Sequence, residues 1–391
     1  MTDLRASFDL RSGILTSGER IGHAAGVPVV GAIVPERLAA LTAARHPDWS
    51  INQPPQGEEP ILVVNGRLLD PPKGIGLETM AAEIDPRDGS VRRALLDRAA
   101  LETLIEDGKL PGSVNVTEVP SPPLAAAAWD VFTSAGGRID SDLEWYGAGE
   151  DDWSRLPGGT TIGEHPVRIS SRAVVGALVV LDARSGPVVV GPGVDIGSHA
   201  VLQGPCAILE DSKITPHAFL KSNTVVGPSC RVGGEVGGTV LQGCSNKSHD
   251  GHLGDSYVGE WVNLGAGTTN SNLLNTYGEV SMRLEPDGPR VRSGRQFLGC
   301  ILGDHVKTAI GTRIMTGTVI GTGAMIAGTT PPASTVARFA WVTDDGIRRF
   351  RLDKFLDVAE TVMARRDEAV SEALRSTLAA LHAAGEAGAD S

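Results

Sequence analysis

The chain has 391 residues, which is enough for two domains with sizeable cores. Its formal net charge of −12 argues against a nucleic-acid or anionic-membrane partner, because phosphate binding needs clustered Lys and Arg. Only 4% of the residues are aromatic, whereas Gly accounts for 49 residues and Pro for 24, which is typical of many tight turns around small, branched core residues. No apolar run reaches the length of a membrane span and the first residues are polar, so we expect a protein of the cytoplasm.

Residues 1–155 have the pattern of an α/β domain. Short apolar runs at 28–34 and 60–66 predict buried strands, and amphipathic patterns at 35–46 and 90–108 predict helices. An alternation of strands and helices is typical of an α/β layer architecture.

A six-residue repeat follows this domain. Steps of six meet a branched aliphatic residue eight times in succession, at Val190, Ile196, Leu202, Ile208, Ile214, Leu220, Val226 and Val232. The residue four positions after each of the first seven is small: Val194, Ala200, Cys206, Ser212, Ala218, Thr224 and Cys230. One aliphatic and one small inward position per hexad predict an all-β, left-handed parallel β-helix, with three hexapeptide repeats in each triangular coil. We expect this domain over residues 156–338.

The repeat changes register twice. It resumes at Val258 and again at Leu302, and Thr308 fills one aliphatic position. A coil loses register where the chain leaves the prism, so we expect two loops, one between Val232 and Val258 and one between Leu264 and Leu302. Polar residues displayed from a rigid scaffold are often functional.

Three of the four cysteines fit the repeat. Cys206, Cys230 and Cys300 fall on the small inward position, which predicts a role as core filler. The cysteines show no CxxC spacing, which argues against a zinc ribbon or a disulfide framework.

Residues 339–391 predict a C-terminal α-helical extension. It can cap the open end of the prism, pack along its side or join contacts between subunits. Its apolar residues recur at helical spacing: Leu352, Phe355, Leu356, Val362, Met363, Val370, Leu374, Leu378 and Leu381.

Four stretches carry a resemblance to a known family. They are FDLRSGILTSGERI at 8–21, GGEVGGTVLQGCSNKSHDGHLGDSYVGEWVNLGAGTTNSNLLNTYG at 233–278, FLGCILGDHVKTAIGTRIMTGTVIG at 297–321 and LDKFLDVAETVMARR at 352–366. The chain resembles the bifunctional UDP-N-acetylglucosamine diphosphorylase/glucosamine-1-phosphate N-acetyltransferase family, and is closest to its divergent sugar-nucleotidyltransferase branch.

The resemblance implies a fold, an assembly and two activities. Residues 1–155 would form a nucleotidyltransferase-like domain, and the β-helix would form a homotrimer that binds acetyl-CoA between two prisms. The family's glycine-rich phosphate loop is absent from residues 1–155, so this domain is either active, with Mg²⁺, or truncated or degenerate.

The resemblance also implies site residues. His249 matches the general base that acts on the amino group of glucosamine 1-phosphate, and Asn263 matches a substrate contact. Ala266 matches a residue whose backbone contacts the thioester, and Gly265 lets the backbone approach closely. Asn272 matches an asparagine that reaches the substrate from a neighbouring chain.

These residue types suit acetyl transfer to an amine. The amine must lose a proton, which a neutral imidazole accepts near neutral pH, and fixed N–H donors stabilise the oxyanion. Lys221 and Lys247 are candidate sugar-phosphate contacts, while Lys307 and Arg313 are weaker candidates near the cofactor phosphates. His252 stands where these acetyltransferases usually carry a tyrosine, which makes it a further substrate-binding candidate.

The same residues also have ordinary structural roles. A loop histidine, a turn asparagine and a surface lysine are common without any chemistry. His199 and His217 are one coil apart and should stack, so with His249 and His252 they suggest a zinc site as a minor alternative. The main functional hypothesis is an N-acetyltransferase of an amino-sugar phosphate. The alternatives are a sugar-1-phosphate nucleotidyltransferase with its chemistry in the first domain, and a non-catalytic trimeric scaffold.

Overall fold

The computed structural model describes residues 1–146, 153–154 and 159–384. The chain divides into two compact units. One contains Thr2–Leu10 and Leu15–Ala128, and the other contains Arg11–Ile14 and the chain from Trp129 onward. The domain boundary predicted between residues 155 and 156 lies outside the described residues. None of the helices in these ranges is both long and apolar enough to cross a membrane.

The N-terminal unit contains two small sheets and four helical segments. β1 (Gly31–Ala32) and β2 (Ser50–Ile51) pair in parallel, and a four-stranded mixed sheet has the order β3-β5-β4-β6. The bounds of its strands are β3 (Ile61–Val64), β4 (Ala81–Ile84), β5 (Val91–Leu96) and β6 (Asn115–Glu118). The helical segments are η1 (Ser7–Asp9), α1 (Ser17–Ala25), α2 (Glu36–Arg45) and α3 (Arg98–Asp107). These elements confirm the predicted α/β class and the strands and helix expected over 28–66.

The helix predicted over 90–108 is wrong in its first half. Val91–Leu96 form β5, which pairs with both β3 and β4. The helix begins only after Asp97, whose side chain accepts a hydrogen bond from the Ala100 N–H. This N-cap fixes the boundary, because it satisfies one of the free N–H groups of the first helical turn.

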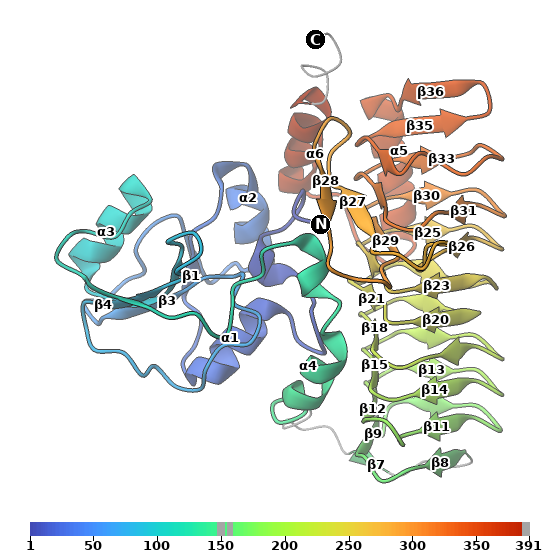
Figure 1. Cartoon of the computed structure of the whole chain (residues 1–391), viewed down its shortest axis with the longest axis horizontal. Coiled ribbons are helices and arrows are strands. Elements are labelled where there is room, and N and C mark those ends of the chain that lie inside the picture. The colour runs from blue at the N-terminus through green and yellow to red at the C-terminus, as the bar shows by residue number, and fades with distance from the viewer. Residues whose placement is uncertain (147–152, 155–158, 385–391) are drawn as a thin grey trace. The chain divides into compact units, whose positions relative to one another are not determined.

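Three sheets of short strands build the β-helix, and the chain visits them in the order I, II, III (Figure 1). Sheet I contains β10 (Val174–Val175), β13 (Asp195–Ile196), β16 (Lys213–Ile214), β19 (Arg231–Val232), β22 (Asn246–Lys247), β25 (Asn263–Leu264), β30 (Lys307–Thr308), β33 (Met325–Ile326), β35 (Ala340–Thr343) and β36 (Gly346–Arg349). Sheet II contains β8 (Thr160–Ile162), β11 (Val180–Asp182), β14 (Val201–Gln203), β17 (Phe219–Leu220), β20 (Glu235–Gly237) and β23 (His252–Gly254). Sheet III contains β7 (Trp153–Ser154), β9 (Val167–Ser170), β12 (Val188–Val190), β15 (Cys206–Ile208), β18 (Thr224–Val226), β21 (Val240–Leu241), β24 (Tyr257–Val258), β29 (Cys300–Leu302), β32 (Thr318–Ile320) and β34 (Thr335–Val336). All pairings are parallel except those of β7 with β9 and β36 with β35, so the predicted fold class is confirmed.

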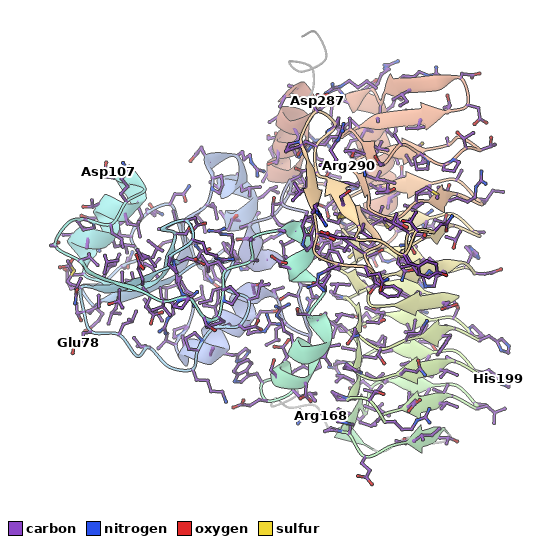
Figure 2. The ribbon with its side chains drawn as sticks, in the orientation of Figure 1. Glu78, Asp107, Arg168, His199, Asp287 and Arg290 are labelled. Atoms are coloured by element: carbon purple, nitrogen blue, oxygen red, sulfur yellow. The ribbon has the colours of Figure 1, made fainter. Side chains whose placement is uncertain are left out.

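Corners join the sheets, and several of them use left-handed backbone. His199 and His217 have φ of 65° and 62°, at equivalent corners between sheets I and II. Both side chains are exposed, and His199 points away from the prism (Figure 2). A polar residue in this conformation is typical of a tight turn that leaves the inward positions free for core residues.

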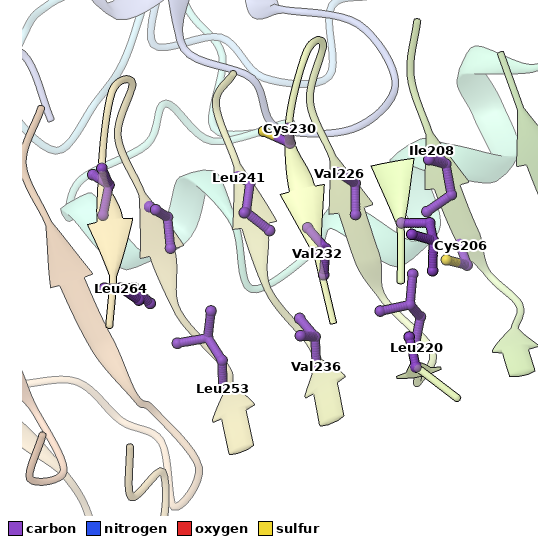
Figure 3. Packing of buried hydrophobic residues seen from close by; sticks show 14 of the residues in the cluster. Cys206, Ile208, Leu220, Val226, Cys230, Val232, Val236, Leu241, Leu253 and Leu264 are labelled. Carbon is purple, nitrogen blue, oxygen red and sulfur yellow. The ribbon is translucent and has the colours of Figure 1, made fainter. Parts of the chain in front are cut away.

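Each sheet contributes one inward residue per coil to the core (Figure 3). Register pairs align these residues in columns, for example Ile196 with Ile214 and Leu202 with Leu220. The cysteines predicted as core filler are fully buried, and burial raises the pKa of the Cys206, Cys230 and Cys300 thiols to about 12. A thiol with such a pKa remains protonated near neutral pH and packs as a small apolar group.

The first predicted loop is wrong, because the chain does not leave the prism between Val232 and Val258. β20, β21, β22 and β23 all pair in parallel with the preceding coil. The coil is shortened instead: Ile214 pairs with Val232, and Val232 pairs in turn with Lys247, which follows it more closely in the sequence. The corner between β19 and β20 contains only Gly233 and Gly234.

The second predicted loop is confirmed. After β26 (Thr269–Asn270) the chain forms an antiparallel hairpin of β27 (Ser281–Arg283) and β28 (Arg290–Arg292) before it re-enters the prism at β29. β26 pairs in parallel with β31 (Arg313–Ile314), so the coils continue on both sides of this excursion.

Helices cover parts of the prism. The segment formed by η2 (Ala128–Val131) and α4 (Ala135–Asp142) contacts sheet III at β15 and β18. The C-terminal extension is two helices rather than one, α5 (Leu352–Ala364) and α6 (Glu372–Ala384), and Asp367 between them has a φ of 58°. Phe355 of α5 packs on His305 and Phe339, which lie at corners between sheets III and I. Of the three placements left open for the extension, the structure shows packing along the side of the prism.

Candidate functional site

Several predicted site residues meet at one corner, between sheets I and II. Asn246 pairs with Asn263, and the chain continues from each strand into the next corner. The residue three positions on is His249 in one coil and Ala266 in the next, so these two residues lie at equivalent places in adjacent coils. The Ala266 carbonyl accepts a hydrogen bond from the Gly311 N–H at 2.7 Å, and the Gly265 N–H donates to the Thr308 hydroxyl at 3.1 Å. This I–II corner therefore presents His249 beside a close-packed, glycine-rich turn.

The His249 side chain is exposed. Its backbone carbonyl, in contrast, accepts a hydrogen bond from the Lys247 ammonium. An exposed imidazole on a bonded backbone suits a group that exchanges protons with a ligand.

Asn263 is exposed on the outer side of sheet I and belongs to a chain of hydrogen bonds. Its Oδ1 lies 3.4 Å from Asn246 Nδ2, and Asn246 Oδ1 accepts from Arg366 Nη2 at 2.9 Å. Asn246 and Arg366 were not among the predicted site residues. Asn246 could have been found from its place one coil before Asn263, but Arg366 follows a helix that is distant in sequence.

A second group of predicted residues gathers along sheet II, with Lys221, His252 and Asn272 in neighbouring coils. Two carboxylates that the sequence did not single out join them. Lys221 Nζ lies 3.2 Å and His252 Nε2 3.9 Å from Glu235 Oε1. Asn272 Nδ2 donates to Asp255 Oδ2 at 2.6 Å.

Asp255 lies in a partly buried position with mixed charge. Burial raises the pKa of its carboxyl, while the Asn272 hydrogen bond and the charges of His252, Lys221 and Arg295 oppose this effect. Cations and acceptors at such close range can bind a ligand that carries both hydroxyl groups and negative charge. We call Lys221, Glu235, His252, Asp255 and Asn272 the sheet II cluster.

Two of the predicted lysine contacts point elsewhere. The Lys247 side chain is only 2% exposed, and its Nζ donates to the carbonyls of Gly233 at 3.2 Å and Asp250 at 3.1 Å, as well as to that of His249. Lys307 Nζ donates to the carbonyls of Trp261 at 2.6 Å and His305 at 3.3 Å. Burial lowers the pKa of both ammonium groups to about 8. In this conformation neither group is oriented towards a phosphate.

Arg313 keeps an exposed side chain. It pairs with Thr269 in the register of β31 and β26, and its Nη2 lies 3.4 Å from the Thr329 carbonyl. It therefore lies one coil beyond the Ala266 corner, and its role towards a cofactor stays a prediction.

The histidines predicted to stack do so. The His199 and His217 ring centroids are 4.9 Å apart, with an interplanar angle of 8°. The in-plane lone pairs of parallel stacked rings lie in two different planes, so one ion cannot coordinate both rings in this arrangement. Within the described ranges, no group of three or more His, Cys, Asp or Glu side chains could hold a metal ion.

The N-terminal unit contains a separate cavity of about 520 Å³. Residues of β1 and β3 line it, and its wall is largely apolar, with Trp49 and Leu38 among the side chains. Arg5 and Arg37 supply its cationic groups.

A prediction about stability follows from the Lys247 pKa. The folded chain releases this proton near pH 8, whereas the reference value for lysine is 10.5. Between these values the unfolded state binds more protons, so the stability of the folded state rises with pH. We expect the free energy of unfolding of the wild type, relative to Lys247→Met, to increase by on the order of 1–3 kcal/mol from about pH 7.5 to about pH 10.

Urea unfolding at each pH measures this difference. Lys213→Met, which removes an exposed lysine of the same sheet, is the control and should leave the difference flat. A flat difference for Lys247→Met as well would contradict the buried, desolvated ammonium.

Comparisons with known proteins agree with part of the sequence analysis. No model of a protein family matches the chain. The bifunctional sugar-1-phosphate nucleotidylyltransferase/acetyltransferase of Sulfurisphaera tokodaii is 34% identical over 143 residues, which are 36% of this chain and 35% of that protein. The bifunctional protein GlmU of Methanococcus vannielii is 32% identical over 115 residues, which are 29% of this chain and 27% of that protein.

Among solved structures, a UDP-N-acetylglucosamine acyltransferase of Francisella novicida aligns with a TM-score of 0.35 and 14% identity, over 53% of this chain and 71% of that chain. The chain thus spans about a third of the length of the curated relatives it matches. The predicted resemblance is confirmed to this extent: about a third of the chain is similar to part of proteins named as bifunctional nucleotidylyltransferase/acetyltransferases.

Proposed function

We propose that the chain is an acetyl-CoA-dependent N-acetyltransferase of an amino-sugar phosphate, with His249 as the general base. The observation that supports this proposal most directly is the register of the I–II corner. Exposed His249 and Asn263 and the close-packed Ala266 turn lie in adjacent coils there. The names of the curated relatives add support for acyl transfer.

The reaction assigns a task to each group at the corner. His249 accepts a proton from the acceptor amine, and the amine nitrogen forms a bond to the acetyl carbonyl carbon. The carbonyl oxygen carries the negative charge of the tetrahedral intermediate, which an Asn263 amide or a backbone N–H of the corner stabilises. The intermediate collapses as the carbon–sulfur bond breaks, and the thiolate of CoA leaves and takes up a proton.

The sheet II cluster is the proposed acceptor side of the site. His252 and Lys221 provide donors and positive charge for hydroxyl and phosphate oxygens, while Glu235 and Asp255 accept from hydroxyl groups. In the proposed homotrimer Asn272 would reach the acceptor bound at the corner of the neighbouring chain. An exposed corner on a single prism excludes little water, which favours a site completed by a second subunit.

Substitution of His249 tests the chemistry. His249→Ala should lower kcat for acetyl transfer by about 10²–10⁴, because a general base contributes a factor of this size. Affinity for acetyl-CoA should change little, since the imidazole faces the acceptor. Release of CoA thiol, followed with amino-sugar phosphates as acceptors, gives kcat and KM.

His217→Ala is the matched control, because it removes an exposed histidine from an equivalent corner. Its kcat should equal that of the wild type. Unchanged turnover in His249→Ala would end the general-base proposal, and loss of activity on chelation of metal would favour the zinc alternative.

A second candidate function is nucleotidyl transfer by the N-terminal unit. The cavity of about 520 Å³ in that unit favours it, since ligand sites are commonly cavities of this size. The lack of a glycine-rich phosphate loop opposes it, because a triphosphate then has no obvious set of backbone N–H donors.

We expect formation of nucleotide sugar from UTP or dTTP and a sugar 1-phosphate, with Mg²⁺, to be weak or absent. Product analysis by mass spectrometry on the full chain measures it. Robust, Mg²⁺-dependent synthesis would contradict this expectation and move the chemistry to the first unit.

A further inference from the structure

Lys247 occupies a position that the repeat reserves for an aliphatic residue. In the inward column of sheet I it follows Ile196, Ile214 and Val232. Its side chain is buried like theirs, yet it ends in an ammonium group. A buried charge is costly unless hydrogen bonds satisfy it, so its partners must be fixed.

Those partners are backbone carbonyls of two adjacent I–II corners. The Nζ donates to Gly233 in the shortened corner and to both His249 and Asp250 in the next one. Three donors of one ammonium thus meet three acceptors, which is the full capacity of a lysine.

The corner that carries His249 differs from its equivalents. His199 and His217 each donate a backbone hydrogen bond to the coil before, to Ala177 at 3.0 Å and Ser198 at 3.1 Å. In the described part of the chain, residues 248–251 donate no backbone hydrogen bond. The turn at His249 is therefore not closed by its own N–H groups.

The shortened corner makes this arrangement possible. Gly234 has a φ of 71°, and a Cβ there would lie 2.9 Å from the His249 carbonyl oxygen. A Cβ on Gly233 would lie 2.5 Å from the Ser248 carbonyl oxygen. Two glycines thus let the next corner settle onto this one, within reach of a lysine that rises from the core.

We propose that Lys247 is a positioning residue, which holds the His249 corner from inside the prism through its backbone carbonyls. The inference rests on the proposed function of His249 for its catalytic consequence, but not for its structural part. Burial lowers the pKa of this ammonium and the nearby Asp250 charge opposes the shift, as expected for a charge retained for its contacts.

Lys247→Met tests the proposal, because it keeps an apolar stem of similar length and removes the three donors. We expect kcat to fall at least about tenfold, while KM for acetyl-CoA changes less than about twofold, since a misplaced base slows chemistry without removing a cofactor contact. Ile196→Ala, in the same column three coils away, is the control for lost core packing. It should lower stability but leave kcat of the folded protein unchanged.

A second readout follows the imidazole directly. In protein with ¹³C-labelled histidine, the His249 signal, assigned through His249→Ala, should shift or broaden in Lys247→Met. The His199 signal should stay in place in both variants. Equal kcat and an unmoved His249 signal in Lys247→Met would overturn the proposal.

Lys247→Gln, which retains an N–H donor, should give an intermediate loss. If both lysine variants fail to fold while Ile196→Ala folds, the proposal also fails, because Lys247 would then serve the whole repeat rather than one corner. If the wild type transfers no acetyl group, the proposed function fails, but the histidine signals still decide whether Lys247 holds the corner.

Discussion

Stacking of coils in register is the constraint on which this structure depends. Each coil can bury its inward side chains only where the residue above and the residue below point the same way. A corner can lose residues, but only if the inward positions still meet. The step from Val232 to Lys247 meets this condition, although it is shorter than the step from Ile214 to Val232. The loss falls in the corner between β19 and β20, so the strands remain paired.

This local shortening connects the fold to the proposed site. Gly233 and Gly234 bring two corners together, the Lys247 ammonium bonds carbonyls of both, and His249 projects from the outer one. The next coil supplies a second polar residue in an inward column, Asn270, whose amide bonds the N–H and the C=O of Gly254. Polar residues at inward positions are thus concentrated in the coils that carry the candidate site residues. Rigid repeats elsewhere in the prism hold these coils in place.

The periodic part of the fold could be read from the sequence because it repeats. The aliphatic columns, the buried cysteines and the excursion after Leu264 follow directly from a period of six. The His199–His217 stack also follows, since three steps of six complete one coil and bring the two rings to equivalent corners.

The remaining features depend on exceptions to that period. A fixed step of six predicts a loop from Val232 to Val258, whereas shorter steps keep the chain in the prism. Lysine is rarely buried, so the sequence suggests a ligand contact for Lys247, and only the pairing with Val232 shows that it faces inward. Likewise, Val91–Leu96 and the helix after it form one amphipathic pattern, although the Asp97 cap separates a strand from the helix. Arg366, Glu235 and Asp255 join the candidate residues through contacts that no local pattern predicts.

The central claim is that an acetyl-transfer site forms at the His249 corner and is completed by a second chain. Co-expression of His249→Ala and Asn272→Ala chains with different affinity tags, followed by purification of assemblies that carry both tags, tests it most directly. Each variant alone should be nearly inactive, and the mixed assembly should regain acetyl transfer, because some of its sites combine an intact His249 with an intact Asn272 from the neighbour. A mixed assembly as inactive as either parent, or a monomeric chain with full activity, would contradict the shared site.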